Sequence, residues 1–169
     1  LWVLKQGQAG AGFEAGMPVS EIVQIEVPRP RFFDAAQQAS TPEQIAQSQA
    51  ALKNVLDMLK PYRDIPGVVA DEAIYWQAFL LEKQQRHAEA LAWYEDIIKQ
   101  PYPSTQANKA RLRAGLCCEQ LGQMEKAAEY LQAAQGAEDD VGLLSEVKLA
   151  QGRALSKLGR CQEALMAYL

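Results

Sequence analysis

Histidine and cysteine, on which most metal and nucleophilic sites depend, are scarce in this sequence. The 169 residues contain one histidine, His87, and three cysteines, Cys117, Cys118 and Cys161. The cysteines lack Cys-x-x-Cys spacing, and two adjacent cysteines rarely form a disulfide. The sequence also has no His-Glu-x-x-His run, no Gly-x-Ser-x-Gly motif and no phosphate-binding glycine loop between a strand and a helix. We therefore predict no catalytic residue, no metal site and no cofactor.

Basic residues are too few to favour nucleic acid as a partner. Lys and Arg number 17 against 21 Asp and Glu, which gives a net charge of −4. Nucleic acids and anionic membrane surfaces are held largely through clustered Lys and Arg, so we expect neither as a direct partner. The odd number of cysteines slightly favours a reducing compartment such as the cytoplasm.

Long apolar runs are also missing. No stretch approaches the roughly 20 apolar residues that a membrane-spanning helix needs. The chain begins at Leu1 rather than Met and stops at Leu169 inside a predicted helix, which is typical of a piece of a longer protein. The apolar residues 1–4 fit either the end of a removed membrane anchor or signal segment, or a short segment that packs on the domain. The first of these would make the protein periplasmic or membrane-anchored.

The composition changes at about residue 30. Residues 1–30 are rich in Gly and Pro, which break helices, and we predict an extended N-terminal arm there. From residue 31 onwards the strong helix formers Ala, Gln, Leu and Glu predominate. Thr41 followed by Pro42 and Glu43 is a helix-start signal, because the hydroxyl caps the helix and Pro suits its first turn. The predicted helices cover about 42–60, 68–84, 87–99, 105–121, 124–135, 141–158 and 161 onwards.

An internal repeat with a step of 37 residues runs through these helices. The residues that share this step are Ala78, Gly115 and Gly152; Ala90, Ala127 and Ala164; and the pairs Gln84-Gln85, Leu121-Gly122 and Leu158-Gly159. Small residues in the middle of one helix and near the start of the next let two backbones approach closely, so each pair of helices is predicted to pack as a hairpin. A glycine inside a helix costs about 1 kcal/mol relative to alanine, which indicates a packing role. The Leu-Gly pair ends the first helix, because Gly adopts the left-handed conformation readily.

This pattern resembles the tetratricopeptide repeat family, whose hairpins carry a small residue at the eighth position, Leu-Gly before the turn, Ala at the twentieth position and an aromatic at the twenty-fourth. The step of 37 exceeds the family's usual 34 residues. The resemblance covers roughly 100 residues and implies an all-α fold, a right-handed superhelical stack of antiparallel hairpins. It places a degenerate hairpin at about 31–62 and repeats at about 71–104, 108–140 and 145–169, the last of them truncated.

The resemblance also implies where a partner binds. In this family, ligand contacts come mainly from the concave surface that the first helices of the hairpins line. Among the residues at the matching positions, those predicted to contact a partner are Tyr75, Phe79, Lys109, Leu112, Arg113, Leu116, Leu149 and Arg153. An apolar strip with a basic flank suits a peptide with an apolar anchor and an acidic group or a terminal carboxylate. Alternatively, Tyr75 and Phe79 pack on the arm or on a neighbouring hairpin.

The carboxylate clamp of chaperone-binding family members is matched only at Lys109 and Arg113, so a chaperone-tail receptor is not expected. On the buried side of the same helix, Ala110, Ala114 and Cys117 follow a helical stripe, which predicts a buried Cys117. Cys161, at a turn, is expected to be exposed.

The sequence therefore predicts a non-catalytic scaffold or adaptor that binds a peptide segment or subunit in a concave groove. Two alternatives remain open. The first is a membrane-anchored structural or assembly subunit of an envelope or other multiprotein complex, for which homo-oligomers are an option. The second is an accessory repeat region of a larger enzyme.

Overall fold

The structure is a computed structural model that describes residues 31–59, 68–100, 104–136 and 140–169. Residues 31–169 form one compact unit, and the predicted N-terminal arm lies outside the described residues. The described residues contain only helices and their connections, which confirms the all-helical prediction. The helices are α1 (Arg31–Gln38), α2 (Pro42–Leu59), α3 (Val68–Lys83), α4 (His87–Ile98), α5 (Ala107–Gln120), α6 (Met124–Ala133), the 3-10 turn η3 (Ala134–Gly136), α7 (Val141–Lys157) and α8 (Cys161–Tyr168).

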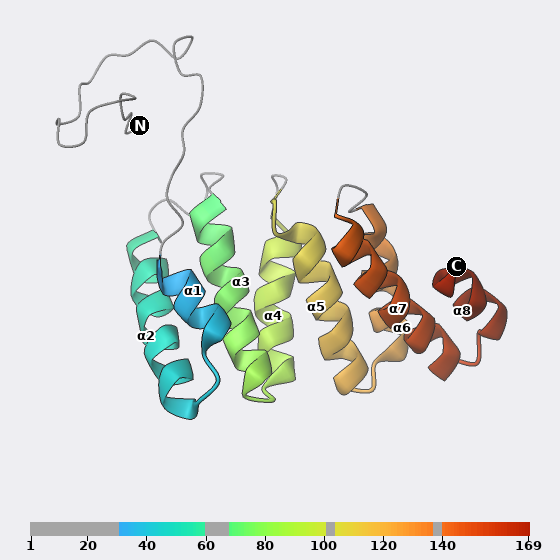
Figure 1. The fold of residues 1–169 in the computed structure, drawn as a ribbon, viewed down its shortest axis with the longest axis horizontal. Helices are drawn as coiled ribbons and strands as arrows, with labels where there is room; N and C mark the ends of the chain where they lie inside the picture. The colour runs from blue at the N-terminus through green and yellow to red at the C-terminus, as the bar shows by residue number, and fades with distance from the viewer. Residues whose placement is uncertain (1–30, 60–67, 101–103, 137–139) are drawn as a thin grey trace, which may run out of the picture. The chain divides into compact units, whose positions relative to one another are not determined.

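Across the view, α1 and α2 lie beside α3, and α3, α4, α5, the overlapping pair α6 and α7, and α8 then follow in the order of the sequence (Figure 1). Each helix packs on the next one in the chain, and three hairpins result: α3–α4, α5–α6 and α7–α8. The first helix of each later hairpin packs on the second helix of the hairpin before it, through α4 with α5 and α6 with α7. Helix α1, which the sequence analysis did not delimit, packs on both α2 and α3.

The start of α2 has the cap that its sequence predicts. The backbone N–H of Gln44 donates to Oγ1 of Thr41 at 3.3 Å, and the Gln44 side chain accepts from the backbone N–H of Thr41 at 3.2 Å. This reciprocal pair is a capping box, in which two backbone donors at the helix start find partners. At the start of α7, the Asp140 carboxylate accepts from the backbone N–H of Leu143 at 2.9 Å.

The three hairpin turns repeat the same backbone geometry. Gln85, Gly122 and Gly159 occupy equivalent places and have φ angles of 62°, 74° and 74°. At each turn, the N–H of the following residue donates to a carbonyl in the last turn of the first helix, for example from Arg86 to Leu81 at 3.0 Å. The pattern is a Schellman cap, which favours glycine at the left-handed position. The first hairpin forms it with Gln85, so the departure of this repeat from Leu-Gly does not change its turn.

Gly115 and Gly152, which lie in the middle of α5 and α7, pack against bulky side chains of the second helix in their own hairpins. A Cβ atom on Gly115 would lie 2.7 Å from Cγ of Leu131, and one on Gly152 would lie 2.3 Å from Cε1 of Tyr168. Leu131 and Tyr168 are equivalent residues in successive repeats. Close packing between helices therefore explains why glycine occurs at these two helical positions.

Candidate functional site

A groove of about 690 Å³ lies along the first helices of the three hairpins. The residues that line it are Phe79, Glu82, Lys83, Gln85, His87, Arg113, Leu116, Glu119, Gln120 and Arg153. Four of the eight residues predicted as a binding surface, Phe79, Arg113, Leu116 and Arg153, thus come together in one groove, from α3, α5 and α7.

The other four predicted residues lie elsewhere. Tyr75 and Leu112 are buried in the core and do not present a surface. The centroid of the Tyr75 ring lies 5.3 Å from that of Trp76 and 5.7 Å from that of Tyr94, so Tyr75 packs inside its own hairpin. Lys109 and Leu149 are exposed at places outside the groove lining.

Phe79 forms the apolar part of the groove at the α3 end. The Lys83 ammonium nitrogen and the Arg113 guanidinium carbon each lie 4.9 Å from the centroid of the Phe79 ring. Both cations are therefore close enough for a cation–π interaction with this ring. Lys83 also donates to the backbone carbonyls of Gln37 and Ala39 at the end of α1. This lysine therefore links the wall of the groove to the leading helix.

Two glutamates, 37 residues apart, lie beneath the basic residues. Glu82 accepts hydrogen bonds from the hydroxyl of Tyr94 at 3.1 Å and from Nη1 of Arg113 at 3.2 Å. Burial raises the pKa of Tyr94 well above its usual value, and the negative charge of Glu82 adds to this effect. Tyr94 is thus a protonated donor at neutral pH, and it fixes the carboxylate that orients Arg113.

The second glutamate, Glu119, binds two cations of the following hairpin. Its carboxylate accepts from Nζ of Lys157 at 2.8 Å and from Nη2 of Arg153 at 3.3 Å. Burial alone would raise the pKa of Glu119, but the hydrogen bonds from Lys157 and Arg153 outweigh burial and hold the pKa below its usual value. The sequence analysis missed both glutamates, although their 37-residue spacing was a signal that could have found them.

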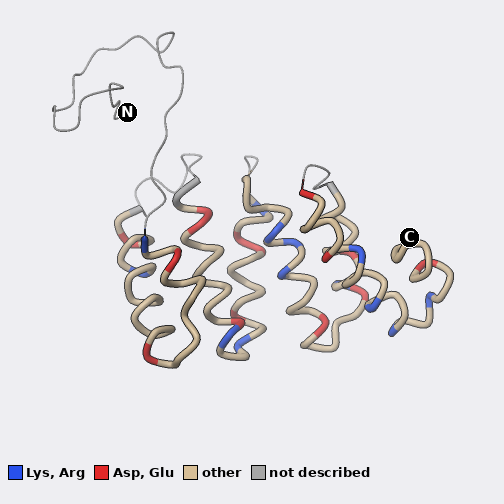
Figure 2. Tube along the Cα trace, viewed as in Figure 1, with Lys and Arg blue, Asp and Glu red and all other residues tan. Residues whose placement is uncertain are grey.

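The exposure of these charged groups decides what an incoming partner meets. The side chains of Glu119 and Glu82 are 7% and 19% exposed, whereas those of Arg113 and Arg153 are 29% and 51% exposed. Arg carries five N–H donors, so one that already binds a carboxylate still has donors for a second acceptor. Along the described chain as a whole, acidic and basic residues are scattered among the helices (Figure 2). The groove therefore presents guanidinium groups outward above a carboxylate floor.

Groups that could react chemically are few around the groove. Cys117 is buried, and burial raises the pKa of its thiol to about 12, so the nucleophilic thiolate is not formed at neutral pH. His87 lies at the turn, with Nε2 3.1 Å from Oε1 of Gln85. Among the described residues, no three His, Cys, Asp or Glu side chains come together as a metal site, and no helix is long and apolar enough to cross a bilayer.

No known protein family has a model that matches this chain, and no curated protein matches it significantly.

Proposed function

We propose that residues 31–169 are a tetratricopeptide-type interaction domain, a right-handed superhelical stack of hairpins that binds a segment of a partner protein. The observation that carries the proposal is the groove itself, because successive first helices contribute to one continuous surface. A groove built from equivalent positions of repeated hairpins suits an extended ligand that runs across several repeats. The domain has no catalytic role in this proposal.

The chemistry of the groove favours a partner segment with an apolar anchor and a carboxylate. Phe79 and Leu116 are partly buried and supply apolar contact area. Arg113 and Arg153 are pre-oriented by Glu82 and Glu119, which lowers the entropy lost when they bind a second acceptor. A Lys- or Arg-rich segment, in contrast, would be repelled by the outward guanidinium groups before it reached the carboxylates.

The proposal is tested by photo-crosslinking in cells that express the full-length protein. A photoreactive phenylalanine analogue replaces Gln120, which is exposed and lines the groove, or Asp96, which is exposed on α4 outside the groove lining. We expect one or more defined adducts from position 120 and none of the same adducts from position 96. Adducts from position 96 alone would contradict the proposal, because they would place the binding surface on the second helices.

Affinity for a crosslinked partner separates the groove from general charge effects. Arg153→Ala is expected to weaken binding about five- to thirtyfold, since a charge-assisted hydrogen bond contributes about 1–2 kcal/mol. Lys99→Ala removes another exposed cation, which pairs with Glu95 on α4, so it serves as the control and should leave the affinity unchanged. Equal losses in both variants would mean that net charge, and not the groove, attracts the partner.

One observation favours the assembly-subunit alternative as a second candidate. Leu149, Leu165 and Tyr168 are exposed on α7 and α8, although their equivalents 37 residues earlier, Leu112, Ala128 and Leu131, are buried. If this apolar surface makes a permanent contact, Leu165→Glu should lower the apparent mass of the native assembly in size-exclusion chromatography with light scattering. An unchanged mass would contradict the assembly-subunit alternative.

A further inference from the structure

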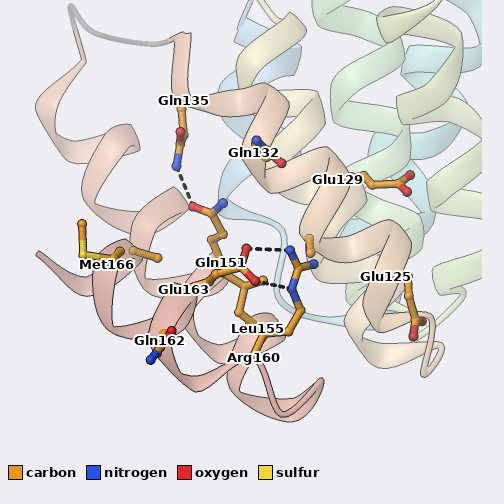
Figure 3. Close-up of a pocket in the computed structure, with 12 residues that line it drawn as sticks. Glu125, Glu129, Gln132, Gln135, Gln151, Leu155, Arg160, Gln162, Glu163 and Met166 are labelled. Carbon is orange, nitrogen blue, oxygen red and sulfur yellow. Dashed lines mark hydrogen bonds and ion pairs between the residues drawn. The ribbon is translucent and has the colours of Figure 1, made fainter.

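A second groove, of about 610 Å³, lies between the second helices α6 and α8, with α7 beneath it (Figure 3). The apolar part of its lining comes from Ala128, Leu155 and Ala167, and Met166 lies at one side. Its polar part includes Gln132 and an amide pair, in which Nε2 of Gln135 donates to Oε1 of the buried Gln151 at 2.6 Å. This groove shares no lining residue with the one described above.

The preceding pair of second helices, α4 and α6, shows what the corresponding place holds. There the side chain of Tyr130 packs against both core clusters, and its hydroxyl donates to the Glu95 carboxylate of α4 at 2.8 Å. Burial, the hydrogen bond to Glu95 and the charge of Glu95 raise the pKa of Tyr130, so its hydroxyl stays a proton donor to that carboxylate. A tyrosine ring therefore covers the joint between α4, α5 and α6.

The 37-residue step maps this arrangement directly onto the α6–α8 groove. The equivalents of Glu95, Cys118, Lys126 and Tyr130 are Gln132, Leu155, Glu163 and Ala167. All four of these later residues line the groove. The groove thus arises where alanine replaces the tyrosine that covers the earlier joint, while a hydrogen-bonding side chain stays at the position that holds the phenol oxygen.

We propose that the α6–α8 groove binds a tyrosine side chain of a partner protein, with the ring against Leu155 and Ala167 and the hydroxyl on the Gln132 amide. The phenol ring would occupy the position that Tyr130 takes one repeat earlier. The Gln132 amide both donates and accepts, so it suits a hydroxyl. The inference concerns a site separate from the proposed groove along α3, α5 and α7, and it does not depend on that function.

The rim of the groove sets a preference for the residues beside the tyrosine. Glu125 and Glu129 are exposed one helical turn apart on α6. Glu163 is held by Arg160 through two hydrogen bonds of 2.7 and 2.6 Å, so that ion pair is internally compensated. The two remaining carboxylates make the rim acidic and favour Lys or Arg next to the tyrosine in the partner segment.

The probe for this site is the blocked tripeptide Lys-Tyr-Lys, titrated into the 169-residue chain and followed by the amide NMR signals of Ala128, Leu155 and Ala167. We expect saturable shifts at these three residues at millimolar peptide, as befits a single side-chain anchor. The peptide Glu-Tyr-Glu should bind about two- to fivefold more weakly, the effect of exposed charge pairs. Lys-Ala-Lys should produce no saturable shifts at these residues.

Two variants distinguish the site from non-specific binding. Ala167→Tyr restores the arrangement of Tyr130 and should abolish the shifts. Gln132→Ala changes an exposed side chain, so it should leave the fold intact. In this variant, Lys-Tyr-Lys and Lys-Phe-Lys should bind with about equal affinity, because the hydrogen-bond partner of the hydroxyl is gone. Arg153→Ala, in the other groove, is expected to change nothing here.

A reciprocal variant supplies the matched control. Tyr130→Ala should open the α4–α6 joint and produce a second set of peptide-dependent shifts, at Leu91 and Cys118. The inference is overturned if Lys-Tyr-Lys causes no saturable shift up to about 20 mM, a concentration well above the millimolar Kd expected for a single anchored side chain. It is equally overturned if Lys-Ala-Lys matches its effect or if the shifts persist in the folded Gln132→Ala variant with no change in the Tyr-over-Phe preference.

Discussion

Hairpins α5–α6 and α7–α8 carry the same residue pattern 37 positions apart, yet their surfaces differ greatly in exposure. Leu112 of α5 is 3% exposed, whereas its equivalent Leu149 of α7 is 55% exposed. Leu112 lies in the apolar cluster that α5 shares with α6 and α7. Leu149 of α7 and Leu165 of α8 remain exposed. A position in a repeat therefore does not by itself determine burial, since the neighbouring hairpin contributes half of each contact surface.

Truncating the two equivalent leucines should give the largest difference in the free energy of unfolding between the two hairpins. Leu112→Ala removes a buried side chain and should lower the free energy of unfolding by about 2–5 kcal/mol. Leu149→Ala changes an exposed side chain and should stay within about 0.5 kcal/mol of the parent. Urea unfolding followed by circular dichroism measures both. Similar losses in the two variants would show that Leu149 is covered by another surface in solution.

Gly115 and Gly152 allow a second comparison of stability between the same two hairpins. Gly115→Leu would force a side chain against the buried Leu131, and we expect a loss near the upper end of the 1–3 kcal/mol range for overpacking. Gly152→Leu meets the ring of Tyr168, which is half-exposed and can turn outward in part, so a smaller loss of about 2 kcal/mol is expected. Thermal unfolding of both variants tests the order, and a larger loss at Gly152 would contradict it.

Substitutions at the left-handed positions of two hairpin turns should change the free energy of unfolding less, and in opposite directions. Gln85→Gly relieves a left-handed conformation in a non-glycine residue and should stabilise the fold by about 0.5–1 kcal/mol. Gly122→Gln introduces the same strain at a place where an added Cβ has open space around it, so a loss of about 1 kcal/mol reports backbone conformation alone. A stability increase in both variants, measured by urea unfolding, would exclude this explanation.

The cysteines provide a comparison that does not depend on unfolding energies. Cys161 on α8 is exposed and should react with an aromatic disulfide reagent at pH 8 within minutes. Cys117 and Cys118 on α5 are buried, and burial raises the pKa of both thiols, so they should react only when the protein opens. Mass spectrometry of the labelled chain identifies the modified residues. Early labelling of Cys117 would mean that α5 is less well covered than the structure indicates.

Local patterns let the sequence predict much of the fold. The Thr41-Pro42 start, the Leu-Gly turns and the small residues at a 37-residue step each act through backbone conformation or close packing within one hairpin. These features correctly predicted helices, turns and the burial of Cys117. They missed α1 as a separate helix, because eight residues give too short an apolar pattern to delimit.

The candidate site was predictable only in part. The resemblance to tetratricopeptide repeats singled out Phe79, Arg113, Leu116 and Arg153 on the first helices, and the structure brings these four into one groove. The sequence did not predict that Tyr75 is buried against Tyr94, nor that Glu82 and Glu119 orient the arginines. Both facts depend on contacts between different helices.

The sequence by itself determined the helices, their caps and turns, and the period that relates the hairpins, because these follow from interactions between residues close in the chain. Only the tertiary structure decided which equivalent residues are buried, which cations are held by a carboxylate, and where Ala167 leaves a groove that Tyr130 covers one repeat earlier. Burial and pairing depend on the surface that the next hairpin supplies. That surface changes from one repeat to the next even where the pattern of small residues does not.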